Sequence, residues 1–107
     1  MKIIDSSKLN KTSETWGSSV IMFENKSSQV EIGLFSVDAR KSMAMHEHED
    51  EDELIFVLDG EAYFAVEEKE VKLGKGSAIL IPKQVQHRAF NNNEKTCLCL
   101  YIVSPLE

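Results

Sequence analysis

Residues 46–60 read HEHEDEDELIFVLDG, so an acidic segment that carries two histidines runs directly into an apolar stretch and an Asp-Gly pair. His46 and His48 are two residues apart, so on a strand both side chains point to one face and can reach the same ion. The apolar residues 54–58 have the length of a strand, and Asp59-Gly60 supplies turn chemistry. This stretch therefore predicts a strand-rich fold with a metal site.

Glu53 is the carboxylate that we expect to join the two histidines. It lies five residues beyond His48, which is the wrong parity for one straight strand. A hairpin turn over residues 49–52 would remove this difficulty, because Glu53 would then begin the next strand, opposite the histidines. Glu51 or Asp52 could serve instead if the turn differs by one residue.

The third histidine of the chain, His87, follows Pro82 at the start of another expected strand. If that strand lies beside the first, the site offers three imidazoles and one carboxylate. This donor set suits one divalent transition metal ion, namely Fe, Mn, Ni, Zn or Co, and leaves one or two positions open on an octahedral ion.

Short apolar or alternating runs separated by polar or glycine-bearing breaks recur along the chain, at 19–23, 29–37, 43–48, 53–58, 61–66, 70–73, 77–81, 86–91 and 96–103. About nine short strands at such spacing predict an all-β antiparallel sandwich or barrel. The polar segment 5–15 lacks the apolar stripe of a helix. Several runs are apolar on both faces, so we expect one face to be covered by a second sheet or by a partner subunit, most simply in a homodimer.

The net charge of −6 comes from one segment, because six of the 18 acidic residues lie within residues 47–53. We expect the acids other than Glu53 to form a solvated turn, and the lack of a basic face argues against nucleic acid as a partner. No apolar run approaches the roughly 20 residues that cross a membrane, and residues 1–10 do not resemble a signal peptide. We therefore expect a cytoplasmic protein, in which Cys97 and Cys99 are reduced core thiols.

The residues named so far resemble the two motifs of the cupin superfamily. His46-x-His48-x4-Glu53-x6-Gly60 is similar to the first motif, and Gly76-x5-Pro82 followed by His87 is similar to the second. The resemblance implies a single small cupin domain over residues 1–107, folded as a double-stranded β-helix, a jelly-roll-type antiparallel barrel. In this scheme the first motif spans about 40–60, the second about 76–91, and residues 1–15 form a polar N-terminal arm. The implied metal ligands are His46, His48, Glu53 and His87.

Three positions depart from the family pattern. Arg40 and Gln84 stand where the family usually has glycine, and Ser77 stands where aspartate is frequent. None of them removes a ligand. Asn91, four residues after His87, is expected to serve the structure as a turn or strand-end residue.

The resemblance implies a small-molecule substrate or ligand and leaves three functions open. The first is an enzyme, a mononuclear metal oxygenase or a related metal-dependent lyase or isomerase, acting on a small oxygen-chelating molecule, with Glu53 as a ligand or as a general base. The second is a non-enzymatic small-molecule-binding or sensor cupin with a structural metal. The third, a metal-free carbohydrate isomerase or epimerase, is disfavoured by the complete set of four ligands.

Overall fold

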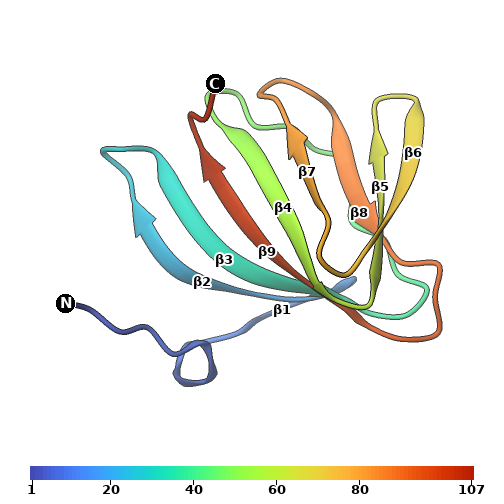
Figure 1. Cartoon of the computed structure of the whole chain (residues 1–107), viewed down its shortest axis with the longest axis horizontal. Coiled ribbons are helices and arrows are strands. Elements are labelled where there is room, and N and C mark those ends of the chain that lie inside the picture. Colours follow the sequence, from blue (N-terminus) through green and yellow to red (C-terminus); the bar gives the residue numbers. More distant parts are fainter.

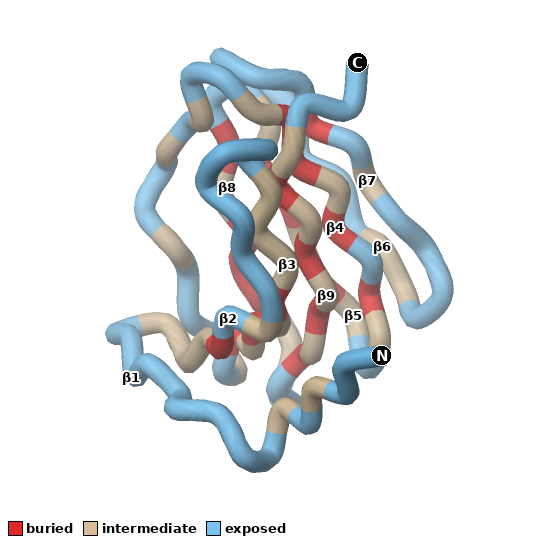
Figure 2. The backbone as a smooth tube through the Cα atoms, turned by 90° about the vertical axis from the view of Figure 1, so that its left-hand side faces the viewer, coloured by how far each residue is buried: buried red, intermediate tan, exposed pale blue.

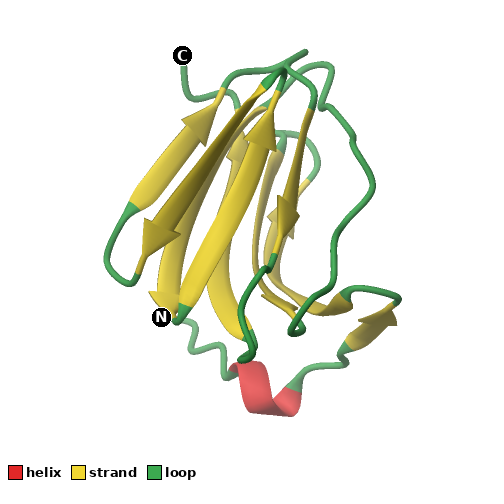
Figure 3. Ribbon diagram, turned by 90° about the vertical axis from the view of Figure 1, so that its right-hand side faces the viewer, coloured by secondary structure: helices red, strands yellow, loops and turns green.

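The computed structural model describes all 107 residues and consists of two antiparallel sheets that face each other (Figures 1 and 3). The six-stranded sheet contains, in spatial order, β1 (Thr12–Glu14), β2 (Gly17–Asn25), β3 (Val30–Val37), β9 (Cys97–Ser104), β4 (Asp52–Asp59) and β7 (Ala78–Ile81). The three-stranded sheet contains β6 (Lys69–Gly74), β5 (Glu61–Val66) and β8 (His87–Phe90). This architecture confirms the all-β, double-stranded β-helix fold.

The N-terminal residues contain the only helix of the structure, the single 3-10 turn η1 (Ser6–Lys8). Asp5 caps this turn, since its side chain accepts a hydrogen bond from the backbone N–H of Ser7. The structure contains no helix with the length and hydropathy that crossing a bilayer requires. Strand β1, which pairs only with β2, was not predicted, because its Ser/Thr-rich sequence carries no apolar alternation.

The core lies between the two sheets and follows the alternation of the strands. Along β9 every second residue is buried, and the residues between them, on the opposite face, are only half-buried. Figure 2 shows the buried positions gathered along the middle of the sheet, on β3, β4 and β9. The cysteines of β9 are both free and fully buried, as predicted. The core cluster comprises Phe35, Val37, Ile55, Val57, Ala62, Phe64, Ile81, Ala89, Cys97, Cys99, Tyr101 and Val103.

The predicted strand 43–48 is wrong in one respect, because it forms no continuous ladder. The segment pairs with β8 only through isolated bridges, Ser42 with Phe90 and His46 with His87. Between these two bridges the chain advances four residues from Ser42 to His46 but only three along β8. The extra residue interrupts the hydrogen-bond pattern as a β-bulge does. The segment nevertheless lies against β8, which fixes where its histidines point.

The expected hairpin over residues 49–52 is also wrong. Strand β4 is already paired on both edges, with β9 and with β7, so residues 43–48 cannot lie beside it. The chain instead crosses from the three-stranded sheet to the six-stranded sheet. Glu53 therefore faces the histidines across the barrel and not across a turn.

Two positions that lack the family's glycine keep the backbone conformation that glycine favours. The φ angle is +65° at Arg40 and +66° at Gln84, both in the left-handed region. The backbone N–H of Gln84 donates to the carbonyl of His48 at 2.7 Å, so its left-handed turn joins the two motifs. Both residues thus adopt a left-handed conformation without being glycine, at a cost of about 1–2 kcal/mol per residue.

Candidate metal centre

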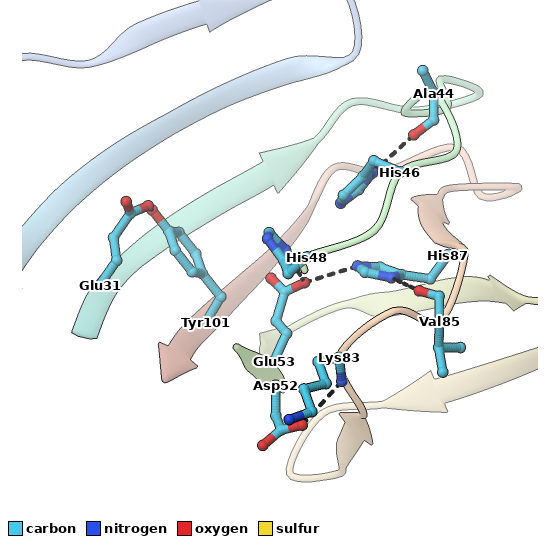
Figure 4. Close-up of polar contacts among 10 residues, drawn as sticks. All are labelled: Glu31, Ala44, His46, His48, Asp52, Glu53, Lys83, Val85, His87 and Tyr101. Carbon is cyan, nitrogen blue, oxygen red and sulfur yellow. Dashed lines mark hydrogen bonds and ion pairs between the residues drawn. The ribbon is translucent and has the colours of Figure 1, made fainter. Parts of the chain in front are cut away.

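Four side chains from three parts of the chain converge inside the barrel. His46 and His48 come from the bulged segment beside β8, His87 is the first residue of β8, and Glu53 is the second residue of β4. One nitrogen or oxygen atom from each of the four lies within 4.8 Å of the others. The structure therefore brings together all the ligands predicted from the sequence, as Figure 4 shows.

Backbone carbonyls fix the orientation of two of the rings. His46 Nδ1 lies 2.9 Å from the carbonyl of Ala44, and His87 Nδ1 lies 2.9 Å from the carbonyl of Val85. Because a carbonyl oxygen only accepts, each Nδ1 must carry a proton and donate it. In a neutral ring the lone pair then sits on Nε2, directed away from that carbonyl, which is the arrangement found at metal-ligating histidines.

The position of the Glu53 carboxylate beside two imidazole rings explains why a cation fits between these side chains. Its Oε1 lies 2.9 Å from His87 Nε2 and 3.2 Å from His48 Nε2. A carboxylate oxygen and an imidazole lone pair repel each other at such distances, so a proton or a metal ion must lie between them. Three nitrogens and one oxygen in this arrangement make up a donor set that could hold a divalent transition metal ion.

The electrostatics of the site favour an ionised carboxylate. Burial alone would raise the pKa of Glu53, but the hydrogen bonds from His48 and His87, with their positive charge, lower the pKa to about 2. The pKa of His48 is raised, chiefly because it donates to Glu53. Glu53 is 7% exposed, so this negative charge is held inside the protein, where a bound cation would compensate it.

The four candidate ligands lie in the wall of a cavity of about 390 Å³. Ala44, Ile55 and Ala89 share the faces of His46, Glu53 and His87, as the alternation predicts, and all three line the cavity. The remaining walls are mainly apolar and aromatic. A cavity of this volume accepts a small molecule beside the ion.

Several residues of this cavity were not predicted from the sequence, namely Trp16, Glu31, Met43 and Tyr101. Glu31 could have been found, because it alternates with Phe35 on a strand whose inward face is apolar. Met43 could not, since it faces the cavity only through the bulge in its segment. Tyr101 and Phe35 also line the cavity, and the parity of their strands alone cannot show which aromatic side chains face it.

One member of the acidic run does not belong to a solvated turn. Asp52 is 3% exposed, and its carboxylate accepts hydrogen bonds from the backbone N–H groups of Lys83, Leu106 and Glu107 at 2.8–2.9 Å. These backbone hydrogen bonds lower the pKa of Asp52, and the one from Lys83 has the largest effect. Asp52 thus anchors the segment after β7 and the C-terminal residues beside the ligand Glu53, and it is not an alternative ligand.

The Cupin domain family model matches residues 33–103. No curated protein sequence matches the chain at a significant level. KdgF from Halomonas sp. superposes with a TM-score of 0.85 at 18% identity, covering 100% of this chain and 96% of that one.

Two further solved structures show the same fold. A predicted oxalate decarboxylase from Thermotoga maritima has a TM-score of 0.83 at 17% identity and covers 98% of this chain and 100% of its own. An RmlC-like cupin from Shewanella frigidimarina has a TM-score of 0.83 at 16% identity, with 100% and 93% covered. At these identities the likeness shows the fold alone. The family match spans most of the chain and includes both motifs, so the chain belongs to the cupin family.

Proposed function

We propose that this protein is a metal-dependent enzyme that acts on a small oxygen-chelating molecule, as a mononuclear oxygenase or a related lyase or isomerase. The observation that carries this proposal is the position of the four ligand atoms in the wall of a cavity. A purely structural metal site is usually closed by its protein ligands, whereas a catalytic site keeps an open position beside space for substrate.

Bound at these residues, a divalent ion would supply Lewis acidity and, for oxygenase chemistry, a site for dioxygen. The protein's own contribution is orientation and charge. The carbonyls of Ala44 and Val85 hold the rings of His46 and His87 in one tautomer, and the apolar walls exclude water from the reacting molecule. Glu53 is buried, and the hydrogen bonds from His48 and His87 keep its carboxylate ionised by lowering its pKa. If it left the ion and these hydrogen bonds, burial alone would raise its pKa, and it could then accept a proton from the substrate as a general base.

The experiment that tests the proposal is a screen of the reconstituted protein. Each of the five candidate ions is loaded, and enediols, β-diketones and α-keto acids are offered while oxygen consumption and product formation are followed. Turnover that requires the ion and disappears in His87→Ala supports the enzyme. Binding of these compounds without any turnover would favour the alternative, a small-molecule-binding or sensor cupin.

We further propose a homodimer formed by the outer face of the six-stranded sheet. Two rows of apolar side chains cross this face in register and contain no charged residue: Phe23, Ile32, Ile102, Leu54 and Leu80 in one, Val20, Leu34, Leu100, Phe56 and Ala78 in the other. Phe56 is 37% and Leu80 43% exposed. Val20 is already buried within the chain at 8% exposure, so the other nine side chains would form the apolar centre of an interface that buries about 800 Å² per partner.

The partner in this proposed interface is thus a second copy of this chain. The buried free thiols Cys97 and Cys99 fit a reducing compartment, and we keep the cytoplasm as the proposed location.

A further inference from the structure

Beyond the four ligands, the cavity wall carries one other polar pair, Tyr101 and Glu31. Tyr101 lies on β9 and Glu31 on the neighbouring strand β3, and the Tyr101 hydroxyl donates to Glu31 Oε2 at 2.7 Å. Tyr101 is only 8% exposed. In Figure 4 the pair lies on the side of His48 and Glu53 that is away from His87, so it faces the metal site across the cavity.

Gly33 shows that the position of the tyrosine ring is specified. Tyr101 pairs with Gly33 in the ladder between β3 and β9. A Cβ atom added at Gly33 would lie 2.6 Å from the Tyr101 hydroxyl oxygen and 2.7 Å from Cε1 of its ring. The same Cβ atom would lie even closer to the carbonyl oxygen of Val20, so the backbone of β2 and the tyrosine ring both pack closely at Gly33, and the ring has room there because residue 33 is glycine.

The hydrogen bond between these two residues decides what they can offer to a ligand. Tyr101 has one proton, which it donates to Glu31, and burial together with that hydrogen bond raises the pKa of the phenol, so the proton is retained. The remaining lone pairs of the hydroxyl and of the carboxylate can only accept hydrogen bonds. The pair is therefore complementary to a donor, a hydroxyl or an ammonium group.

The charged side chains around the cavity also favour a hydrogen-bond donor at this end of the cavity. No Lys or Arg side chain lines it, so an anionic group can be compensated only at the metal end. A second cavity of about 350 Å³ adjoins the first, shares Glu31 and His48 with it, and is lined by the further carboxylates of Glu24 and Glu51 together with Lys26. A ligand that extends past Glu31 would thus remain in surroundings dominated by carboxylates.

We propose that Glu31, positioned by Tyr101, determines substrate specificity by accepting a hydrogen bond from a hydroxyl or ammonium group at the end of the substrate opposite its chelating oxygens. This inference rests on the proposed function, because it needs the ion to hold the chelating end. It describes a bifunctional substrate, with an oxyanion chelator at one end, an apolar middle and a donor at the other. It excludes substrates with a carboxylate at both ends.

The test uses three hydroxamates that share a chelating group and a flexible chain and differ at the far end. Caprohydroxamate ends in a methyl group, ε-aminocaprohydroxamate in an ammonium group, and adipate monohydroxamate in a carboxylate. Their dissociation constants are measured by calorimetry with the metal-loaded wild type and with Glu31→Gln and Tyr101→Phe. Glu68→Gln, which removes the same charge from the exposed turn after β5, is the matched control.

We expect the wild type and the control to bind the ammonium probe about tenfold more tightly than the methyl probe, as a charge-assisted hydrogen bond predicts. Glu31→Gln should abolish this preference, and Tyr101→Phe should reduce it, while all variants retain affinity for the methyl probe. Equal affinities in the wild type, a preference that survives Glu31→Gln, or tighter binding of the carboxylate probe would overturn the inference alone. Failure of every hydroxamate to bind the loaded wild type would overturn the proposed function and the inference with it.

Discussion

His87 and Glu53 lie on different sheets, and His87 Nε2 is 2.9 Å from Glu53 Oε1 in the middle of the barrel. Both side chains are buried, at 2% and 7% exposure, so this contact joins the two sheets inside the core. An ion bound between them would be shared by both sheets. If these side chains hold an ion, its binding and the stability of the fold should therefore be coupled.

The same contacts predict how the stability of the metal-free protein depends on pH. The pKa of Glu53 falls from 4.5 to about 2 when the protein folds. Its contribution to the free energy of unfolding is therefore complete above pH 4.5 and is lost as the pH falls toward 2. The pKa of His48 in the folded protein is raised above 6.5. Its contribution to the free energy of unfolding is therefore complete below pH 6.5 and is lost as the pH rises through this higher pKa. Metal-stripped protein should therefore be most stable between these limits in denaturant titrations.

His48→Gln isolates the histidine's part of this profile. The variant should show a smaller decline on the alkaline side and keep the decline on the acidic side, because the His87–Glu53 hydrogen bond remains. An alkaline decline of unchanged size in His48→Gln would show that another group causes it.

Asn91 should prove structural, since it makes three hydrogen bonds to the backbone. Its Nδ2 donates to the carbonyls of Val37 and Lys95, and its Oδ1 accepts from the N–H of Asn93. Asn91→Ala leaves these groups without a partner in the core and should lower the free energy of unfolding by about 2–4 kcal/mol.

The exposed neighbour Asn92→Ala is the control for this variant and should change the free energy of unfolding by less than about 0.5 kcal/mol. Both proteins should take up metal as the wild type does. Loss of metal by Asn91→Ala with unchanged stability would instead place Asn91 among the groups that hold the ion.

The proposed dimer predicts that a charge in the middle of the apolar rows separates the two copies. Phe56→Glu places a carboxylate in the second row, inside the proposed interface, where an unpaired charge is costly. Light scattering during size-exclusion chromatography should give the mass of two chains for the wild type and of one chain for the variant.

Val71→Glu is the matched control, because Val71 is 41% exposed, like Phe56, but lies on β6 of the other sheet. This variant should remain dimeric. A wild type that elutes as a monomer at micromolar concentration, or dissociation by Val71→Glu alone, would rule out the interface on the six-stranded sheet.

Much of the site could be predicted because its signals are local. Two-residue spacing puts His46 and His48 on one face whatever sheet they join, and the residue types at Glu53 and His87 match the family's ligand positions. The alternation of each strand likewise identifies the buried face. These features depend only on the period of a strand and on side-chain chemistry.

What could not be predicted depends on pairing between distant segments. The expected hairpin before Glu53 was wrong because the partners of β4 are β9, the last strand of the chain, and β7. Asp52 was expected in a solvated turn, but its carboxylate is buried and accepts hydrogen bonds from Lys83 and Leu106, which lie far along the chain. The pair of Tyr101 and Glu31, 70 positions apart, is visible only once β3 and β9 are neighbours.

The metal content of the purified protein tests the central claim most directly. Wild type, purified without added metal and then reconstituted, should contain about one equivalent of a divalent transition metal per chain by elemental analysis. His87→Ala and Glu53→Ala should lose most of it and still fold, whereas Glu49→Ala, an exposed acid of the same run, should keep it. Less than about a tenth of an equivalent in reconstituted wild type, or unchanged content in both ligand variants, would contradict the account.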